Sequence, residues 1–529
     1  MGDDAGAGNP TDRVRALWAR GIAQAATPGH ETPAVAVAIA LFAAAWCAFH
    51  IVSFRGIPLH ADLTEIYAWS RHPALGNYKH PPLGTLMAAA WFAVFPAAEW
   101  SFRLLALTNA ALALFFVDRI ARRYLAGEKR LFCILLLMLT PFYQLLAERF
   151  ASNQTLVSTW PLATWCFLRA FESRRWTWAV AAGATATLAM LGKYWSVYLL
   201  AGFLVAALSH PDRRAYLCSV SPWISMAAGA LVLAPHIAWL VANDFPPFTY
   251  ALAVHGRRSF ASATTGSLAY LAGAVAYVAL PLAVYALAVR PGAALLRETV
   301  WPTDPRRRML VVLLAVPLLL PALLAPFIGG RIVALWTMSA WFLLPVALLS
   351  PPGATVTRIA LSRTAAGLAG VTVLALVAAP FIAILGARAD LSESRPYYAA
   401  AARELTALWH ATAPGPLPIV MGPEDLVTAI TFYSPDHPDS VPGGSLAFSP
   451  WVTPARLAAE GWVLVCRGEQ AWCGASADGL LRSEPGARRF DRTFTYDYAA
   501  RGSGSGQIVF VIVPPRSAGN PNAPPRTPR

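Results

Sequence analysis

Long apolar stretches recur along most of the chain and are separated by short polar loops. Clear examples are Ala34–Val52, Ser219–Val241, Met309–Phe327 and Thr364–Leu385. A helix needs about 20 apolar residues to cross the hydrocarbon layer of a membrane. These stretches therefore predict membrane-spanning helices and not the buried helices of a soluble domain.

Taken in order, the apolar runs predict about eleven spanning helices. They lie near residues 33–53, 102–117, 131–147, 155–171, 177–191, 195–209, 218–241, 267–289, 309–327, 333–349 and 362–385. A further run, Leu83–Phe95, is shorter than the roughly 17 residues that a span needs, so we expect it to lie along the membrane interface. The predicted fold class is an all-α polytopic membrane domain over residues 33–387, with interfacial helices in its first outside loop (54–100).

From about residue 388 the chain becomes polar, and short apolar runs alternate with helical patterns. The predicted strands are Leu417–Met421, Trp462–Cys466 and Gln507–Val513. The predicted helices are Tyr397–Thr412 and Pro454–Glu460. This alternation predicts a small α/β domain over residues 388–514. Residues 515–529, rich in Pro, Asn and Arg, have the composition of a disordered tail.

The charges are distributed as in a membrane protein. The 529 residues are 57% hydrophobic and 13% charged, with a formal net charge of +14. Such a charge would suggest a nucleic-acid partner for a soluble protein, but here Lys and Arg lie mostly in short loops. If residues 1–32 are cytoplasmic, the inside loops carry more than twice as many Lys and Arg residues as the outside loops. The first long loop and the C-terminal domain are then predicted to lie on the non-cytoplasmic side of the membrane, which in a bacterial inner membrane is the periplasmic side.

The cysteines fall into two groups. Four of the six lie within or at the edge of apolar segments and are interpreted as small hydrophobic residues. Cys466 and Cys473 lie in the polar C-terminal region, seven residues apart. This spacing favours a small disulfide in an oxidising compartment. Metal binding is the weaker alternative, because no other Cys or paired His lies nearby to complete a tetrahedral site.

The first outside loop gathers acidic and aromatic side chains next to the membrane. Asp62 and Glu65 are three residues apart, so a short helix would place both carboxylates on one side, with Tyr67 nearby. One interpretation is a general base in a catalytic site. The other is that these acids cap an interfacial helix. The residues alone favour neither.

The outside loops also carry cations that could hold a phosphate group. They are Lys79, His80, Arg149, Lys193, His255, Arg257, Arg258 and Arg331. For each one alone, contact with a lipid headgroup or snorkelling from a helix end is the simpler interpretation. Lys193 is the exception, because it interrupts an apolar stretch and a charge at membrane depth costs about 2.5 to 3.5 kcal/mol.

Several motifs resemble a known enzyme class. An Asp and a Glu after the first span, followed by His80–Gly84 (HisProProLeuGly), resemble the GT-C glycosyltransferases of the protein-mannosyltransferase and aminoarabinose-transferase type. The segments Phe102–Ala106, Leu191–Ser196, Ala234–Leu240 and Asn243–Pro247 are also similar to bacterial members. The resemblance extends over roughly residues 35–350.

The resemblance implies roles for individual residues. It places the acceptor-activating base on Asp62 and a second acid on Glu65, although Leu63 and Thr64 intervene where many members have adjacent acids. Which carboxylate is the base therefore stays open. It also places the donor phosphate at Lys79 and His80. Tyr67, Tyr78, Asn153 and Tyr194 are the predicted substrate-binding residues.

The resemblance further implies an inverting hexosyl- or pentosyltransferase that uses a polyprenyl-phosphate sugar, such as an undecaprenyl-phosphate sugar. The acceptor would be lipid A or another lipid, a glycan or a protein. The reaction requires no cofactor, because cations can stabilise the leaving phosphate, and a divalent cation bound by the loop carboxylates is an alternative. A transporter or flippase of a lipid-linked sugar is the competing hypothesis. The expected location of the charges on one face, and not at the midplane of interrupted helices, argues against it.

Overall fold

The computed structural model describes residues 10–256, 258–385, 395–484, 486–498 and 502–516. The chain forms two compact units. The first consists of Met1–His50, Leu75–Gly84 and Phe102–Ala378, and the second of Ile51–Ala74, Thr85–Ser101 and Ala379–Arg529. Most of the first outside loop thus groups with the C-terminal region, and the predicted domain boundaries stay a prediction. Arg257 and residues 517–529 of the predicted tail lie outside the described residues.

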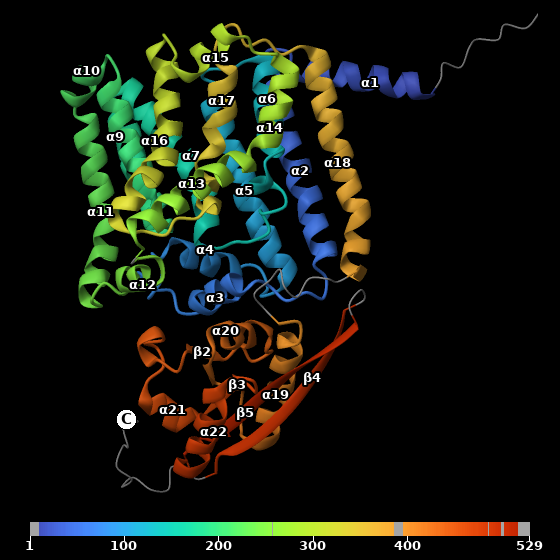
Figure 1. Cartoon of the computed structure of the whole chain (residues 1–529), viewed down its shortest axis with the longest axis vertical. Coiled ribbons are helices and arrows are strands. Elements are labelled where there is room, and N and C mark those ends of the chain that lie inside the picture. Colours follow the sequence, from blue (N-terminus) through green and yellow to red (C-terminus); the bar gives the residue numbers. More distant parts are fainter. Residues whose placement is uncertain (1–9, 257, 386–394, 485, 499–501, 517–529) are drawn as a thin grey trace, which may run out of the picture. The chain divides into compact units, whose positions relative to one another are not determined.

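The first unit is a bundle of helices, in which the long helices run roughly side by side (Figure 1). Its α-helices, some of which extend into the second unit, are α1 (Pro10–Ala25), α2 (Glu31–Ser53), α5 (Glu99–Ala121), α6 (Gly127–Met138), α7 (Ser152–Ser173), α8 (Trp176–Gly192), α9 (Val197–Ser209), α10 (Arg213–Leu217), α11 (Ser221–Ala242), α12 (Pro246–His255), α13 (Phe260–Tyr277), α14 (Ala279–Val289), α15 (Ala293–Val300), α16 (Pro305–Ile328), α17 (Leu344–Leu349) and α18 (Arg358–Leu385).

Several of these helices are long and apolar enough to cross a membrane. Within the described residues, α2, α5, α11, α16 and α18 meet this condition, and α13 and α14 together form a sixth candidate that is bent by 51°. Together with the fold reported below, they indicate a multi-pass membrane protein. The count of eleven spans stays a prediction.

Besides 267–289, which is broken between α13 and α14, two more of the predicted spans are not continuous helices. The run 131–147 contains α6, which ends at Met138, and then a 3-10 turn over Pro141–Tyr143. Proline has no N–H to donate and disfavours helical geometry in the residue before it. The run 333–349 contains two 3-10 turns before α17. There the Thr337 hydroxyl donates to the Ala334 carbonyl oxygen at 2.7 Å, a local bond that competes with regular helix.

Helices α8 and α11 pack closely because small residues face each other. Gly183 and Thr187 are four residues apart on α8, and Ser225 and Gly229 are four apart on α11. A Cβ atom on Gly183 would overlap the Ser225 carbonyl group. The Thr187 hydroxyl donates to the Gly229 carbonyl oxygen at 3.0 Å. Small residues spaced in this way let the backbones of membrane helices approach.

The second unit contains α3 (Ala61–Ser70), most of α4 (Leu83–Phe92) and an α/β domain. The α/β domain has a five-stranded sheet in the order β2-β1-β3-β5-β4, where β1 pairs in parallel with β2 and β3, and β5 is antiparallel to β3 and β4. Its strands and helices are β1 (Ile419–Gly422), β2 (Asp439–Pro442), β3 (Trp462–Arg467), β4 (Arg488–Tyr498), β5 (Gly502–Val513), α19 (Tyr398–Thr412), α20 (Glu424–Tyr433), α21 (Pro454–Glu460) and α22 (Ala471–Ser483).

Helices cover both faces of this sheet. Val463 and Val465 of β3 pack in one cluster with α19 and α20, whereas Leu464 and Cys466 pack in another with α22. Alternate residues of a strand point to opposite faces, which accounts for this division. The sheet thus belongs to a small domain of the predicted α/β type. Cys466 and Cys473 are joined in a disulfide that links β3 to α22.

The contact between α8 and α11 makes a testable prediction. We expect Gly183→Ala to lower the midpoint of thermal unfolding of the detergent-purified protein, because overpacking costs about 1–3 kcal/mol. The matched control is Gly367→Ala in α18, where an added Cβ meets nothing within 4 Å. There alanine is favoured over glycine by about 1 kcal/mol in a helix, so the midpoint should not fall. Equal midpoints for the two variants would contradict the proposed close contact.

Candidate active site

The two predicted acids lie on α3 of the second unit. His60 is the N-cap of this helix, and its imidazole Nδ1 accepts a hydrogen bond from the Asp62 backbone N–H at 3.2 Å. The Asp62 carboxylate is 52% exposed and lies 3.7 Å from the same nitrogen. Glu65, one turn later, is 8% exposed. The cap of the helix is therefore His60, and Asp62 is left in its first turn with an accessible carboxylate.

Tyr67 lies on the buried side of α3. Its ring makes edge-to-face contacts with Phe92 of α4 and with Phe432 and His437 of the α/β domain, at centroid distances of 5.2, 5.0 and 5.7 Å. Burial raises the pKa of its hydroxyl, so the phenol is neutral at physiological pH. The predicted role of Tyr67 in substrate binding stays a prediction, and the structure gives its ring a packing role.

Lys79 and His80 lie in a tight loop of the first unit. The Asn77 side-chain oxygen accepts hydrogen bonds from the backbone N–H groups of Lys79 and His80 at 3.0 and 2.8 Å. The Lys79 ammonium lies 5.5 Å from the ring centroids of both Tyr78 and Tyr250. Tyr78 is 7% exposed, so the loop fixes the cation against a largely buried aromatic pair.

Lys193 forms a second group of side chains in the first unit. Its ammonium donates to the Asn153 side-chain oxygen at 2.6 Å and lies 4.6 Å from the centroid of the Trp336 ring. The His255 ring contacts the same tryptophan edge-to-face at 5.1 Å. Burial, followed by the charges of Lys193 and Arg331, lowers the pKa of His255. The positive charges of Lys193 and Arg331 thus both disfavour protonation of the His255 ring.

Arg331 and Arg258 line a pocket of about 480 Å³ between α13 and the segment after α16. Their backbone N–H groups donate to the carbonyl oxygens of His255 and Gly329 at 2.7 and 3.0 Å, respectively. The Tyr270 hydroxyl, also in the pocket lining, is buried and has no hydrogen-bond partner within the described residues. Two guanidinium groups and a buried hydroxyl suit a pocket for an anion.

Tyr194 lies beside the Lys193 group, next in sequence. Its hydroxyl is 2.7 Å from Nε2 of His236, and Nδ1 of that histidine is 2.6 Å from the Leu75 carbonyl oxygen. The Tyr194 ring stacks on Phe248 at 4.9 Å. His236 therefore has a partner at each nitrogen, as expected for a structural histidine.

The structure thus brings together some of the predicted residues. Lys193, Asn153 and Arg331 belong to one neighbourhood of the first unit, and Lys79 and Tyr78 to another. Asp62 and Glu65 belong to the second unit. In the described part of the chain, no three His, Cys, Asp or Glu residues are arranged to hold a metal ion.

Sequence reasoning missed Trp336, Tyr270 and Asp439. The two aromatic residues lack any local signal, because Trp and Tyr are common throughout the apolar runs. Asp439 lies in a short polar strand, and its contacts with the first loop, described below, join residues more than 360 positions apart.

Comparisons with known proteins find one family model that matches part of the chain and solved structures that share its fold. A family model described as dolichyl-phosphate-mannose-protein mannosyltransferase matches residues 79–239. No curated protein is significantly similar to the chain in sequence.

Among solved structures, the chain is similar to ArnT from Cupriavidus metallidurans bound to undecaprenyl phosphate. The TM-score is 0.57 and the sequence identity is 15%, and the match covers 89% of this chain and 97% of the ArnT chain. The apo state of the same ArnT matches with a TM-score of 0.56, 15% identity and coverage of 92% and 98%. The family model and the shared fold confirm that this chain resembles the GT-C type polyprenyl-phosphate-sugar glycosyltransferases.

Proposed function

We propose that the protein is an inverting glycosyltransferase that moves a hexosyl or pentosyl group from a polyprenyl-phosphate donor to a lipid, glycan or protein acceptor. The reaction would take place on the periplasmic side of a bacterial inner membrane. The observation that carries this proposal is the family-model match over residues 79–239, which contains Lys79, His80, Asn153 and Lys193. The undecaprenyl phosphate bound by ArnT, which shares the fold, supports a polyprenyl-phosphate donor.

The reaction is a single displacement. The acceptor oxygen or nitrogen forms a bond to the anomeric carbon of the sugar while the bond from that carbon to the phosphate oxygen breaks. The acceptor proton passes to the carboxylate of Asp62 or Glu65, and polyprenyl phosphate leaves with the electron pair. One displacement inverts the anomeric configuration, and because the leaving group is a stable anion, a single base suffices.

The accessibility of Asp62 favours it as the base. Its carboxylate is about half exposed, so it can accept a proton from an incoming acceptor. Glu65 is largely buried, which suits a supporting role more than direct contact with a variable acceptor.

The cations of the first unit would stabilise the departing phosphate. Lys193 is held by Asn153 and Trp336, and the guanidinium groups of Arg258 and Arg331 line the neighbouring pocket. Charge-assisted hydrogen bonds from such groups are strong in a site with little water, and they act where negative charge develops. Lys79 and His80 would add to them from their loop.

The proposed base gives the first functional test. We expect Asp62→Asn to lower the rate of polyprenyl-phosphate release about 10²- to 10⁴-fold, the usual contribution of a general base, while the donor dissociation constant stays within about twofold. Glu65→Gln, measured in parallel, assigns the base, since the carboxylate whose loss costs more is the one that takes the proton. The assay follows free polyprenyl phosphate released from radiolabelled donors by detergent-purified protein in the presence of membrane acceptors.

The same assay separates transfer from transport. A flippase would bind the donor without releasing free polyprenyl phosphate. If the wild-type protein binds a donor and releases none with any acceptor, the transferase proposal is wrong and the transport hypothesis replaces it.

Lys193 gives an independent prediction. We expect Lys193→Met to weaken donor binding about 10- to 100-fold, because a hydrogen bond to a charged group contributes about 1.5–3 kcal/mol. Lys129→Met is the matched control, because the ammonium of this lysine also donates a hydrogen bond, to the Pro351 carbonyl oxygen at 3.0 Å, but lies in a predicted cytoplasmic loop. Binding is measured by titration with the radiolabelled donor. Equal affinities for the two variants would remove Lys193 from the proposed phosphate site.

A further inference from the structure

We propose that the α/β domain positions helix α3 for the transfer reaction, and that Thr428 and Asp439 are the positioning residues through which it acts. This inference rests on the proposed function, because α3 carries the proposed base. It assigns a catalytic purpose to a domain that contains neither of the predicted acids.

The central contact joins the middle of α3 to helix α20. The side-chain oxygens of Thr64 and Thr428 are 3.0 Å apart, although the residues are 364 positions apart in sequence. Both residues are at most 1% exposed. Thr64 lies between Asp62 and Glu65 on the same helix, so a shift of this contact would move both carboxylates. Each hydroxyl also has a carbonyl acceptor in its own helix, Ala61 for Thr64 at 3.0 Å and Glu424 for Thr428 at 2.9 Å. One hydroxyl can therefore donate to its own helix while it accepts from the other, which links the two helices through a buried pair.

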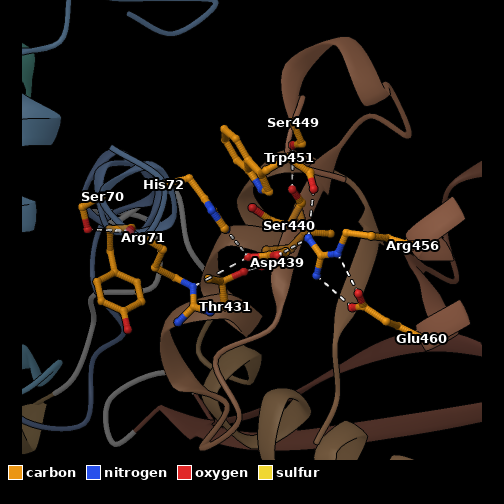
Figure 2. Close-up of polar contacts among 12 residues, drawn as sticks. Ser70, Arg71, His72, Thr431, Asp439, Ser440, Ser449, Trp451, Arg456 and Glu460 are labelled. Carbon is orange, nitrogen blue, oxygen red and sulfur yellow. Dashed lines mark hydrogen bonds and ion pairs between the residues drawn. The ribbon is translucent and has the colours of Figure 1, made fainter. Parts of the chain in front are cut away.

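A second contact holds the C-terminal end of α3 (Figure 2). Nε2 of His72 is 2.6 Å from the carboxylate of Asp439 in β2, and the imidazole stacks on the Trp451 ring at 4.5 Å with an angle of 16°. Arg71 lies 3.9 Å from the same carboxylate, on the α3 side. These contacts come from the two residues that follow α3, so they fix the direction in which the helix ends.

Asp439 is itself held in place from the domain side. The Arg456 guanidinium donates to its second carboxylate oxygen at 3.0 Å and also to both carboxylate oxygens of Glu460 at 2.8 Å (Figure 2). Burial alone would raise the pKa of Asp439, but the hydrogen bonds from His72 and Arg456 and the charge of Arg71 lower it. The carboxylate therefore stays ionised and can hold His72 at physiological pH.

The N-terminal side of α3 is held by a third contact. The Leu59 backbone N–H donates to the Tyr433 hydroxyl at 2.7 Å, and that hydroxyl donates to the Glu99 carboxylate at 2.6 Å. Together with the packing of Tyr67 on Phe432, the domain contacts α3 before its start, along its length and after its end. Such support matters because a misplacement of about 1 Å at a reacting group can cost 10²-fold in rate.

The first test compares two threonines of α20. We expect Thr428→Val to lower kcat at least tenfold while the donor dissociation constant and the midpoint of thermal unfolding change little. Thr431→Val is the matched control, because Thr431 is equally buried and its hydroxyl, like that of Thr428, donates to a carbonyl oxygen four residues earlier in α20. Thr428→Ser, which restores a hydroxyl, should recover most of the rate. If Thr428 had a merely structural role, Thr428→Val would lower the midpoint of thermal unfolding and would not lower kcat while leaving donor binding unchanged.

A parallel pair of variants tests the histidine contact. His72→Ala should lower kcat in the same way as Thr428→Val. His410→Ala removes a comparable His–Asp contact inside the domain, with Asp436 at 2.8 Å, and should leave kcat unchanged. If Thr428→Val and His72→Ala both turn over at the wild-type rate, the positioning role is overturned while the proposed function stands. A wild-type protein that releases no polyprenyl phosphate overturns both.

A cross-link provides the reverse test and remains informative if a variant folds poorly. The double variant Thr64→Cys, Thr428→Cys is oxidised with diamide, which takes up the two thiol hydrogens as the disulfide forms. We expect the cross-linked protein to keep its activity, since α3 would be locked where the reaction needs it. Each single-cysteine variant, treated identically, is the control for the native thiols. Loss of activity only in the cross-linked protein would show that α3 has to leave the domain, and would overturn the proposal.

Discussion

The structure depends on how the charges of buried side chains are compensated where little water is present. An ion buried in a medium of low dielectric constant is costly unless a partner offsets the lost hydration. Arg130 shows the purely structural solution, because it is 4% exposed and forms two hydrogen bonds with the carboxylate of Asp118, at 2.7 and 2.8 Å. Lys193 shows another one. Its ammonium donates to the Asn153 side-chain oxygen and lies over the face of the Trp336 ring, so an amide and an aromatic ring replace part of its lost hydration.

The same constraint explains why the proposed chemistry relies on cations. A polyprenyl phosphate that loses its sugar gains negative charge at the phosphate. Because little water is present to solvate this charge at the membrane surface, groups of the protein must stabilise it. Fixed donors that are oriented before the reaction need no reorganisation when the charge appears. In the proposed site, the contacts of Lys193 with Asn153 and Trp336 and the backbone hydrogen bonds that hold the chain at Arg258 and Arg331 would provide this fixed arrangement.

Sequence alone could predict the features that depend on local pattern. The apolar runs predicted α2, α11, α16 and α18 to within a few residues, and three apolar runs predicted β1, β3 and β5. Strand β2 was not predicted because it is short and contains Asp439, and β4 was not predicted because more than half of its residues are charged or polar. Lys193 was conspicuous as a charge in an apolar stretch. The contact between Thr64 and Thr428 could not be predicted, because contacts between segments distant in the sequence produce no periodic pattern along the chain.

In the proposed mechanism, the acids and the cations place different demands on the protein around them. Cations that stabilise a leaving phosphate must be held in a dry and rigid environment, which a helical bundle can supply. A base that accepts a proton must meet acceptors of varied structure, so the proposed base Asp62 needs a fixed helix and an accessible carboxylate. A sheet covered by helices on both faces and joined to α22 by a disulfide would give α3 that support, because it offers a compact core to which the helix is joined by contacts such as that of Thr64 with Thr428.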